Sequence, residues 1–123
     1  MAKILWIGGI FFTSQEPQKL KDWYRDILGI ESNEFASIFE WKNQKDVVWG
    51  MTLWAPFPQG SDYFTPSEKW FMINFVVDDI ASLKETLTSK WIPLLSEMDE
   101  PQWKFIHILD IEWNKVELWE PAK

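Results

Sequence analysis

The chain has 123 residues, no cysteine, and a net charge of −7 from 12 basic and 19 acidic residues. The length suits one domain with a real core, and the lack of cysteine excludes disulfides, thiol catalysis and Cys-ligated zinc. There is no basic run for a nucleic-acid backbone and no apolar run near the ~20 residues of a membrane span. We therefore expect a cytoplasmic protein that binds neither nucleic acid nor a membrane.

The first thirty residues predict a strand followed by a helix. Residues 4–12 are apolar or small on both faces, which is typical of a strand covered on both sides. The Gly8-Gly9 pair inside this strand indicates a bulge or a close backbone approach. Pro17 suits the first turn of a helix, and Gly29 suits a left-handed cap at its end. The apolar residues between them follow the helical spacing: Leu20, Trp23, Tyr24, Ile27 and Leu28.

Three further strands complete the first half, at about residues 30–32, 36–41 and 47–54. The polar segment 43–46 predicts a turn before the last of them. Pro56 and Pro58 are expected to end that strand, because proline cannot donate to a strand ladder.

The second half repeats this order. A loop rich in Pro, Gly and Ser precedes a strand at 71–77, and Asp78 or Asp79 can cap the helix that follows. Ile80, Leu83 and Leu87 form the apolar stripe of this helix. Three strands are then expected, at 92–97, 104–109 and 115–119.

Short sequence matches support a duplication. Leu53-Trp54-Ala55-Pro56 matches Leu118-Trp119-Glu120-Pro121, 65 positions later, and residues 10–12 match 73–75 at an offset of 63. We therefore expect one α+β domain of two βαβββ modules, about 1–58 and about 70–123, joined by a linker of about 59–69.

At this point the sequence resembles the glyoxalase/bleomycin-resistance/dioxygenase superfamily, also called the vicinal oxygen chelate family. The match covers nearly the whole chain and is carried by order and spacing rather than by one specific motif. Three segments carry it: Trp23-Tyr24-Arg25-Asp26-Ile27-Leu28-Gly29, Phe75-Val76-Val77-Asp78-Asp79, and the hairpin from Leu109 to Pro121. In the hairpin, Ile111 and Trp113 stand where the family has Pro and Gly.

The resemblance implies two modules whose strands form a curved mixed sheet around a shared cavity. In the family this cavity holds a divalent metal and the substrate, and the ion acts as a Lewis acid on vicinal oxygens. The family's ligand positions fall here on Gly8, Thr52, Met72 and Glu117. Only the last is a hard donor of the kind such metals prefer, so no metal and no other cofactor is expected.

Glu117 and His107 are the candidate catalytic residues. His107 is the only histidine, and the hairpin alignment places it on the strand beside Glu117. Such a pair can transfer a proton, and a carboxylate buried among rings should have a raised pKa. The alternatives are a satisfied structural histidine and a weak two-ligand metal site.

Ten tryptophans and nine phenylalanines form either an aromatic core or the wall of a cavity for a flat ligand. Strand alternation predicts that five ligand-binding residues share the inward faces: Phe12, Trp54, Asn74, Phe105 and Trp119. Four further residues are candidates for the rim: Trp41, Tyr63, Phe64 and Trp70.

The main hypothesis is a metal-free protein that binds an aromatic or hydrophobic small molecule, similar to the drug-sequestering branch of the family. Rings would stack on a ligand, which can be cationic, with Glu117 and His107 as polar anchors. The alternative is a glyoxalase-like lyase or dioxygenase-type enzyme that uses a divalent metal or the His107/Glu117 pair. A third is a non-catalytic module that forms dimers. Because members of the family often pair, a homodimer is expected.

Overall fold

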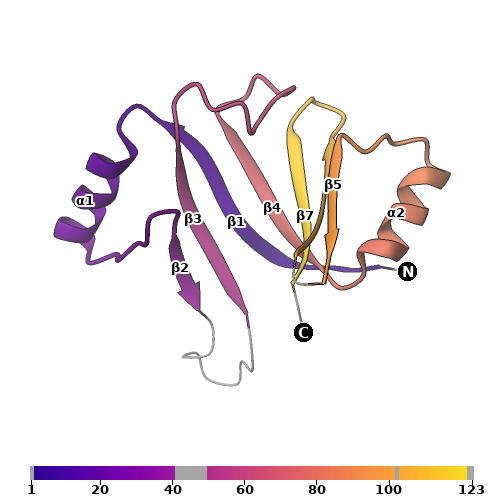
Figure 1. Cartoon of the computed structure of the whole chain (residues 1–123), viewed down its shortest axis with the longest axis horizontal. Helices are drawn as coiled ribbons and strands as arrows, with labels where there is room; N and C mark the ends of the chain where they lie inside the picture. Colours follow the sequence, from indigo (N-terminus) through magenta and orange to yellow (C-terminus); the bar gives the residue numbers. More distant parts are fainter. Residues whose placement is uncertain (1, 41–49, 102, 122–123) are drawn as a thin grey trace.

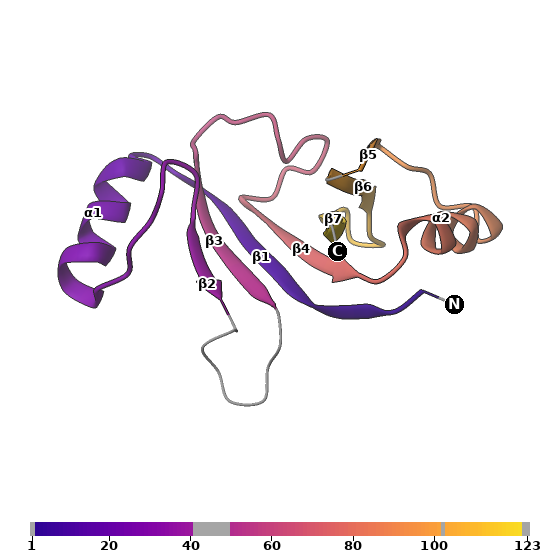
Figure 2. The same cartoon turned by 60° about the horizontal axis from the view of Figure 1, so that its bottom comes forward.

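The computed structural model describes residues 2–40, 50–101 and 103–121. It confirms the α+β class: a single curved mixed sheet of seven strands, with two helices at opposite ends of the molecule (Figures 1 and 2). The strands lie in the order β2-β3-β1-β4-β7-β6-β5. In chain order the elements are β1 (Ile4–Ser14), α1 (Pro17–Leu28), β2 (Ser37–Glu40), β3 (Met51–Pro58), β4 (Phe71–Val77), α2 (Ile80–Ser89), β5 (Ser96–Glu100), β6 (Trp103–Leu109) and β7 (Lys115–Pro121).

The two halves of the sheet have the same internal arrangement. β1 pairs with β3 in parallel, and β4 pairs with β7 in parallel. The halves join where β1 and β4 run antiparallel at the centre of the sheet. Strands far apart in the sequence, β1, β4 and β7, therefore lie side by side (Figure 1).

The predicted helix boundaries are confirmed. α1 begins at Pro17 and ends at Gly29, whose φ of 71° is in the left-handed region that glycine adopts without a Cβ clash. α2 is capped by Asp79, whose Oδ1 accepts a hydrogen bond of 3.1 Å from the Ser82 N–H.

The strand expected at 30–32 is absent, because a turn takes its place. The side chain of Asn33 accepts hydrogen bonds from the backbone N–H groups of Phe35 (2.7 Å) and Ala36 (2.8 Å). Such bonds give the chain a local alternative to a strand ladder.

The prediction that Pro56 ends its strand was wrong, since Pro56 lies inside β3; Pro58, the other proline expected there, is the last residue of the strand. They pair with β1, whereas β2 reaches only as far as Trp54. Beyond Trp54 no described strand needs an N–H from β3 on that side, so proline costs no ladder bond there. Residues 47–49 of the expected strand lie outside the described residues.

The strand expected at 92–97 begins later, at Ser96. The chain leaves α2 through a turn in which the Ile92 N–H donates to the Leu87 carbonyl at 3.0 Å. Residues 92–95 are not in a strand, and β5 extends to Glu100 instead.

A bulge at Gly8 decides which side chains of β1 face which side of the sheet. Ile7 pairs with Phe75 and Gly9 with Asn74, so Gly8 is an extra residue on β1. A Cβ at Gly8 would lie 2.3 Å from Asn74 Oδ1, which leaves room only for glycine. The extra residue reverses the alternation that follows it.

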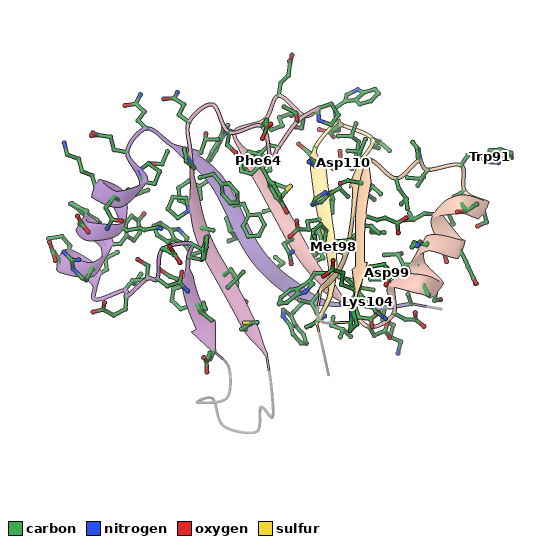
Figure 3. The ribbon with its side chains drawn as sticks, in the orientation of Figure 1. Phe64, Trp91, Met98, Asp99, Lys104 and Asp110 are labelled. Atoms are coloured by element: carbon green, nitrogen blue, oxygen red, sulfur yellow. The ribbon has the colours of Figure 1, made fainter. Side chains whose placement is uncertain are left out.

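The core consists of two clusters of buried apolar side chains. One packs α2 against the sheet: Val77, Ile80, Leu87, Ile106 and Leu118. The other lies under the loop between β3 and β4, where Figure 3 labels Phe64: Phe11, Ala36, Ala55, Phe64 and Met72. This second cluster forms the floor beside the candidate site.

Candidate functional site

Glu117 is the centre of a buried hydrogen-bonded cluster on three adjacent strands. Its Oε1 accepts from Asn74 Nδ2 at 2.6 Å, and its Oε2 accepts from His107 Nε2 at 2.6 Å and from the Tyr63 hydroxyl. Asn74 on β4 and His107 on β6 are the direct register partners of Glu117 on β7. Strand pairing alone therefore brings these three side chains together, as predicted for Glu117 and His107.

The second ring nitrogen of His107 points away from Glu117. Its Nδ1 lies 2.5 Å from the Ser96 hydroxyl, and Ser96 is the register partner of His107 on β5. His107 is 3% exposed and Glu117 is 7% exposed, whereas Ser96 is open to solvent. A continuous series of polar contacts thus connects solvent with the buried carboxylate.

The electrostatics of the cluster correct one prediction. Burial pushes the pKa of Glu117 up, but the hydrogen bonds from His107, Tyr63 and Asn74 outweigh burial and hold that pKa below its ordinary value. The expected raised pKa was wrong, because the prediction included burial and omitted three donors. At neutral pH the carboxylate is ionised and only accepts hydrogen bonds, so His107 carries its proton on Nε2.

Tyr63 remains a protonated hydrogen-bond donor. Burial, followed by the charge of Glu117, raises its pKa well above the ordinary value. Lys115 fixes its position: Nζ donates to the Tyr63 carbonyl oxygen at 2.5 Å and lies 5.2 Å from the centre of the Tyr63 ring. Burial lowers the pKa of Lys115, and the attraction to Glu117 only partly offsets this.

A cavity of about 200 Å³ opens beside this cluster. Its wall is mostly aromatic and apolar, with the polar groups gathered at one side. Three of the five predicted ligand-binding residues line it, together with Glu117. The full lining is Phe11, Leu53, Tyr63, Asn74, Phe105, Glu117 and Trp119.

The predicted placement of Phe12 and Trp54 was wrong. Their rings contact each other at 5.3 Å, and Trp54 contacts Tyr24 of α1 at 4.4 Å between ring centres. The bulge at Gly8 turns Phe11 toward the cavity and Phe12 away from it. On β3, Leu53 lines the cavity, so its neighbour Trp54 faces the helix.

The residues predicted for the rim lie in different parts of the structure. Tyr63 lies in the cavity wall, Phe64 is buried in the core cluster, and Trp70 is 65% exposed. Trp41 lies outside the described residues. A ligand-binding role for any of these side chains stays a prediction.

No protein-family model and no curated protein matches the sequence. Solved structures do match along almost the whole chain. A methylmalonyl-CoA epimerase in complex with methylmalonyl-CoA and NH4+ has a TM-score of 0.70 at 13% identity, covering 98% of this chain and 96% of that one. A variant of the Streptomyces coelicolor epimerase in complex with 2-nitronate-propionyl-CoA has a TM-score of 0.68 at 14% identity, covering 98% and 100%.

These epimerases belong to the vicinal oxygen chelate superfamily. The chain has the fold of that superfamily. A third match, an NAD-dependent benzaldehyde dehydrogenase from Legionella pneumophila, has a TM-score of 0.59 at 15% identity, covering 93% of this chain and 98% of that one. At such identities the likeness establishes the fold alone. Among the described residues no helix is long and apolar enough to cross a membrane.

The residues at the superfamily's metal positions do not fit the ion that the fold implies. The space at Gly8 is taken by the Asn74 side chain, and Met72 is fully buried in the apolar core. Thr52 donates its hydroxyl to the Ile7 carbonyl at 3.0 Å and is on the opposite face of β3 from Leu53. Within residues 2–40, 50–101 and 103–121, no three His, Cys, Asp or Glu side chains gather. The absence of a metal cofactor stays a prediction.

The sequence analysis missed or misplaced three residues of this site. Tyr63 comes from a loop, where no periodicity predicts direction, and was expected only at the rim. Ser96 lies on a strand whose start was predicted too early. Lys115 could have been found, because it is two residues before Glu117 on the same strand and must share its face.

Proposed function

We propose that this chain is an enzyme of the vicinal oxygen chelate superfamily that moves a proton on a small carbonyl compound. Glu117 would be the base and Tyr63 the donor to the substrate oxygen. One observation carries the proposal: an ionised carboxylate shares one oxygen with a protonated phenol and an imidazole at the wall of an otherwise apolar cavity. Structural likeness to enzymes that hold a CoA compound supports catalysis over binding alone.

The reaction would begin when the substrate carbonyl replaces Glu117 as the acceptor of the Tyr63 hydroxyl. Losing that donor makes the carboxylate more basic, because donors hold its pKa down. Glu117 then takes a proton from the carbon beside the carbonyl, and the C–H electron pair moves onto the carbonyl oxygen. The Tyr63 O–H stabilises that developing charge. Return of a proton from Glu117 to that carbon restores the carbonyl compound, so the step that the site supports is exchange of this proton.

His107 and Ser96 would connect Glu117 with solvent. After abstraction Glu117 holds a proton, which Nε2 can take when His107 carries its ring proton on Nδ1; Nδ1 then gives that proton to the Ser96 hydroxyl, and Ser96 gives one to water. Such a route lets the abstracted proton exchange with solvent. No step passes through a metal, because the donors at the metal positions do not fit one.

We do not propose that this chain binds the CoA group found in the similar enzymes. The net charge is −7, and no lysine or arginine is among the described residues that line the cavity. Lys115, which contacts Tyr63 of the cluster, already donates to the Tyr63 carbonyl, whereas phosphates are usually held by free cationic donors. A neutral carbonyl compound suits a site that already holds one carboxylate.

A small-molecule binding protein is the second candidate. Four rings surround the cavity, which favours stacking on a flat ligand: Phe11, Tyr63, Phe105 and Trp119. Binding without turnover, unaffected by Glu117→Gln, would favour this function over catalysis.

We also propose a cytoplasmic homodimer. Four apolar side chains of β1 are 43–50% exposed, which is unusual for a strand in the middle of a sheet: Ile4, Leu5, Ile7 and Ile10. Light scattering should give twice the chain mass, and a monomeric mass at micromolar concentration would rule the dimer out.

Solvent deuterium exchange tests the enzymatic function directly. The protein is incubated in D2O with a panel of small ketones and hydroxyketones, and loss of the proton beside the carbonyl is followed by NMR. We expect Glu117→Gln to slow exchange by about 10²–10⁴-fold, the usual contribution of a general base, and Tyr63→Phe to slow it as well.

The matched control is Glu120→Gln on the same strand. Glu120 accepts from the Ile80 N–H at the start of α2 and does not line the cavity. Its replacement should leave exchange unchanged. If wild type exchanges no faster than Glu117→Gln with every compound, the proposed function is wrong.

A further inference from the structure

A second hollow adjoins the site cavity on the first half of the sheet. This groove has a volume of about 260 Å³ and shares Phe11 and Leu53 with the site cavity. Its wall includes apolar residues of β3 and the turn before β2: Phe35, Ala36, Ala55 and Phe57. The two hollows are therefore adjacent, and the side chains of Phe11 and Leu53 line both.

Size indicates that a ligand extends into the groove. Small-molecule sites usually measure about 300–1,000 Å³, and the site cavity, at about 200 Å³, is smaller than that range. With the adjoining groove, the combined space falls within the range.

Polarity is divided unevenly between the two hollows. The hydrogen-bonding side chains that surround Glu117 all lie at the end formed by β4, β6 and β7. Among the described residues that line the groove, Glu34 is the single charged one, and its backbone carbonyl accepts from Lys21 Nζ at 2.9 Å. A ligand that fits both hollows is polar at one end and apolar at the other.

Phe35 lines the groove from a turn whose backbone is held by hydrogen bonds. Its ring is 74% exposed, although an exposed phenylalanine gains nothing from the core. The Asn33 side chain accepts from both the Phe35 and the Ala36 N–H groups, which fixes the turn that presents this ring. An exposed ring on an ordered turn beside an apolar groove suits contact with a ligand.

We propose that the substrate is a neutral carbonyl compound with an apolar chain or ring of several carbons, whose apolar part lies in the groove beside Phe35. This rests on the proposed function for the position of the carbonyl at Tyr63 and Glu117. The groove supplies affinity and selects for length, while the cluster around Glu117 performs the reaction.

A series of straight-chain methyl ketones from 2-butanone to 2-decanone tests this proposal. His107 is the only histidine, so its ring protons give an isolated NMR signal for occupation of the polar end. Affinity should rise by up to about fourfold for each added methylene, as expected for burial of a CH2 group. It should level off once the groove is filled.

Phe35→Asp should abolish the rise with chain length and leave the affinity for 2-butanone unchanged. The matched control is Phe39→Asp, because Phe39 is also an exposed phenylalanine, at 45%, and lines neither hollow. The affinity of this control for the ketones should rise with chain length as it does in wild type. Both replaced side chains are exposed, so both variants should fold.

Affinity that does not depend on length, equal slopes in the two variants, or no binding by any ketone would each overturn the groove proposal. Deuterium exchange on the same samples separates the two proposals. Length-dependent binding without exchange would retain the groove and remove the proposed reaction, whereas exchange without length dependence would do the reverse.

Discussion

The two halves of the sheet share one topology and differ in what they place on the cavity side. Phe11 on β1 pairs with Ala55 on β3, and Asn74 on β4 pairs with Glu117 on β7, both in parallel register. The apolar pair of the first half thus occupies the place of the polar pair of the second. The polar groups of the site thus come from the second half, and the apolar surface beside them comes from the first.

Phe11→Ala should have the largest effect on stability, because Phe11 lies between the halves and lines both hollows. The ring is 6% exposed and contacts Phe57 at 5.4 Å between ring centres. Removing it should lower the free energy of unfolding by about 3–5 kcal/mol, measured by urea denaturation. Phe35→Ala is the control, and a cost near 0.5 kcal/mol or below is expected there (roughly the surface value). Equal losses would mean that the shared wall is not a packed core.

Glu117→Gln should have the next-largest effect on the free energy of unfolding. Its effect should depend on pH, unlike that of Phe11→Ala. At neutral pH the loss of charge-assisted bonds should cost about 1–3 kcal/mol. The pKa of Glu117 is lower in the folded than in the unfolded state, so its stabilisation is complete above the unfolded value of about 4.3. That stabilisation is lost as pH falls through the folded value.

The difference in unfolding free energy between wild type and Glu117→Gln should therefore shrink in acid, below about pH 4. The cost of Phe11→Ala should stay nearly constant over the same range, because no charge is removed. Denaturation curves at several pH values check both. A difference that grows as the pH falls would contradict the ionised state of Glu117.

The repeat in the sequence predicted the fold better than it predicted the site. The helix start at Pro17 and the caps at Gly29 and Asp79 depend on local chemistry and could be predicted. The match of Leu53-Trp54 to Leu118-Trp119 suggested equivalent positions, yet Trp119 lines the cavity and Trp54 contacts Tyr24. Strand register depends on long-range pairing, and a shift of one residue reverses every side chain.

The bulge at Gly8 is a second feature whose effect on side-chain direction the sequence alone did not predict. The glycine pair indicated an irregular strand, but its effect on Phe11 and Phe12 requires the position of the extra residue. The pairing of Asn74, His107 and Glu117 was predictable because all three lie on regular strands. Tyr63 was not, since its position depends on the bond from Lys115 to a loop carbonyl.

Lys115→Leu should test whether Lys115 holds the loop between β3 and β4, which carries Tyr63, in place. From the pairing of Ala55 with Phe11 and of Glu117 with Asn74, the counterpart of Lys115 in the first half is Leu53. The variant thus makes the two halves alike at this position. Loss of the bond to the Tyr63 carbonyl should cost about 0.5–1.5 kcal/mol and slow the deuterium exchange. If Tyr63→Phe and the double variant exchange at the same rate, Lys115 acts through Tyr63; additive losses would contradict that.

Ser96→Ala should have the smallest effect on stability and the clearest spectroscopic one. Ser96 is exposed, so loss of its hydroxyl should lower the free energy of unfolding by less than about 1 kcal/mol. The only histidine of the sequence lies in the second half, so the first half offers no counterpart for this contact. Nitrogen-15 NMR of the single imidazole should show Nε2 protonated and Nδ1 accepting from Ser96 in wild type. In the variant the Nδ1 signal should move toward that of a free acceptor while Nε2 stays bound to Glu117. A proton found on Nδ1 instead would mean that Nε2 accepts from a protonated Glu117, and the ionised state assigned to that carboxylate would be wrong.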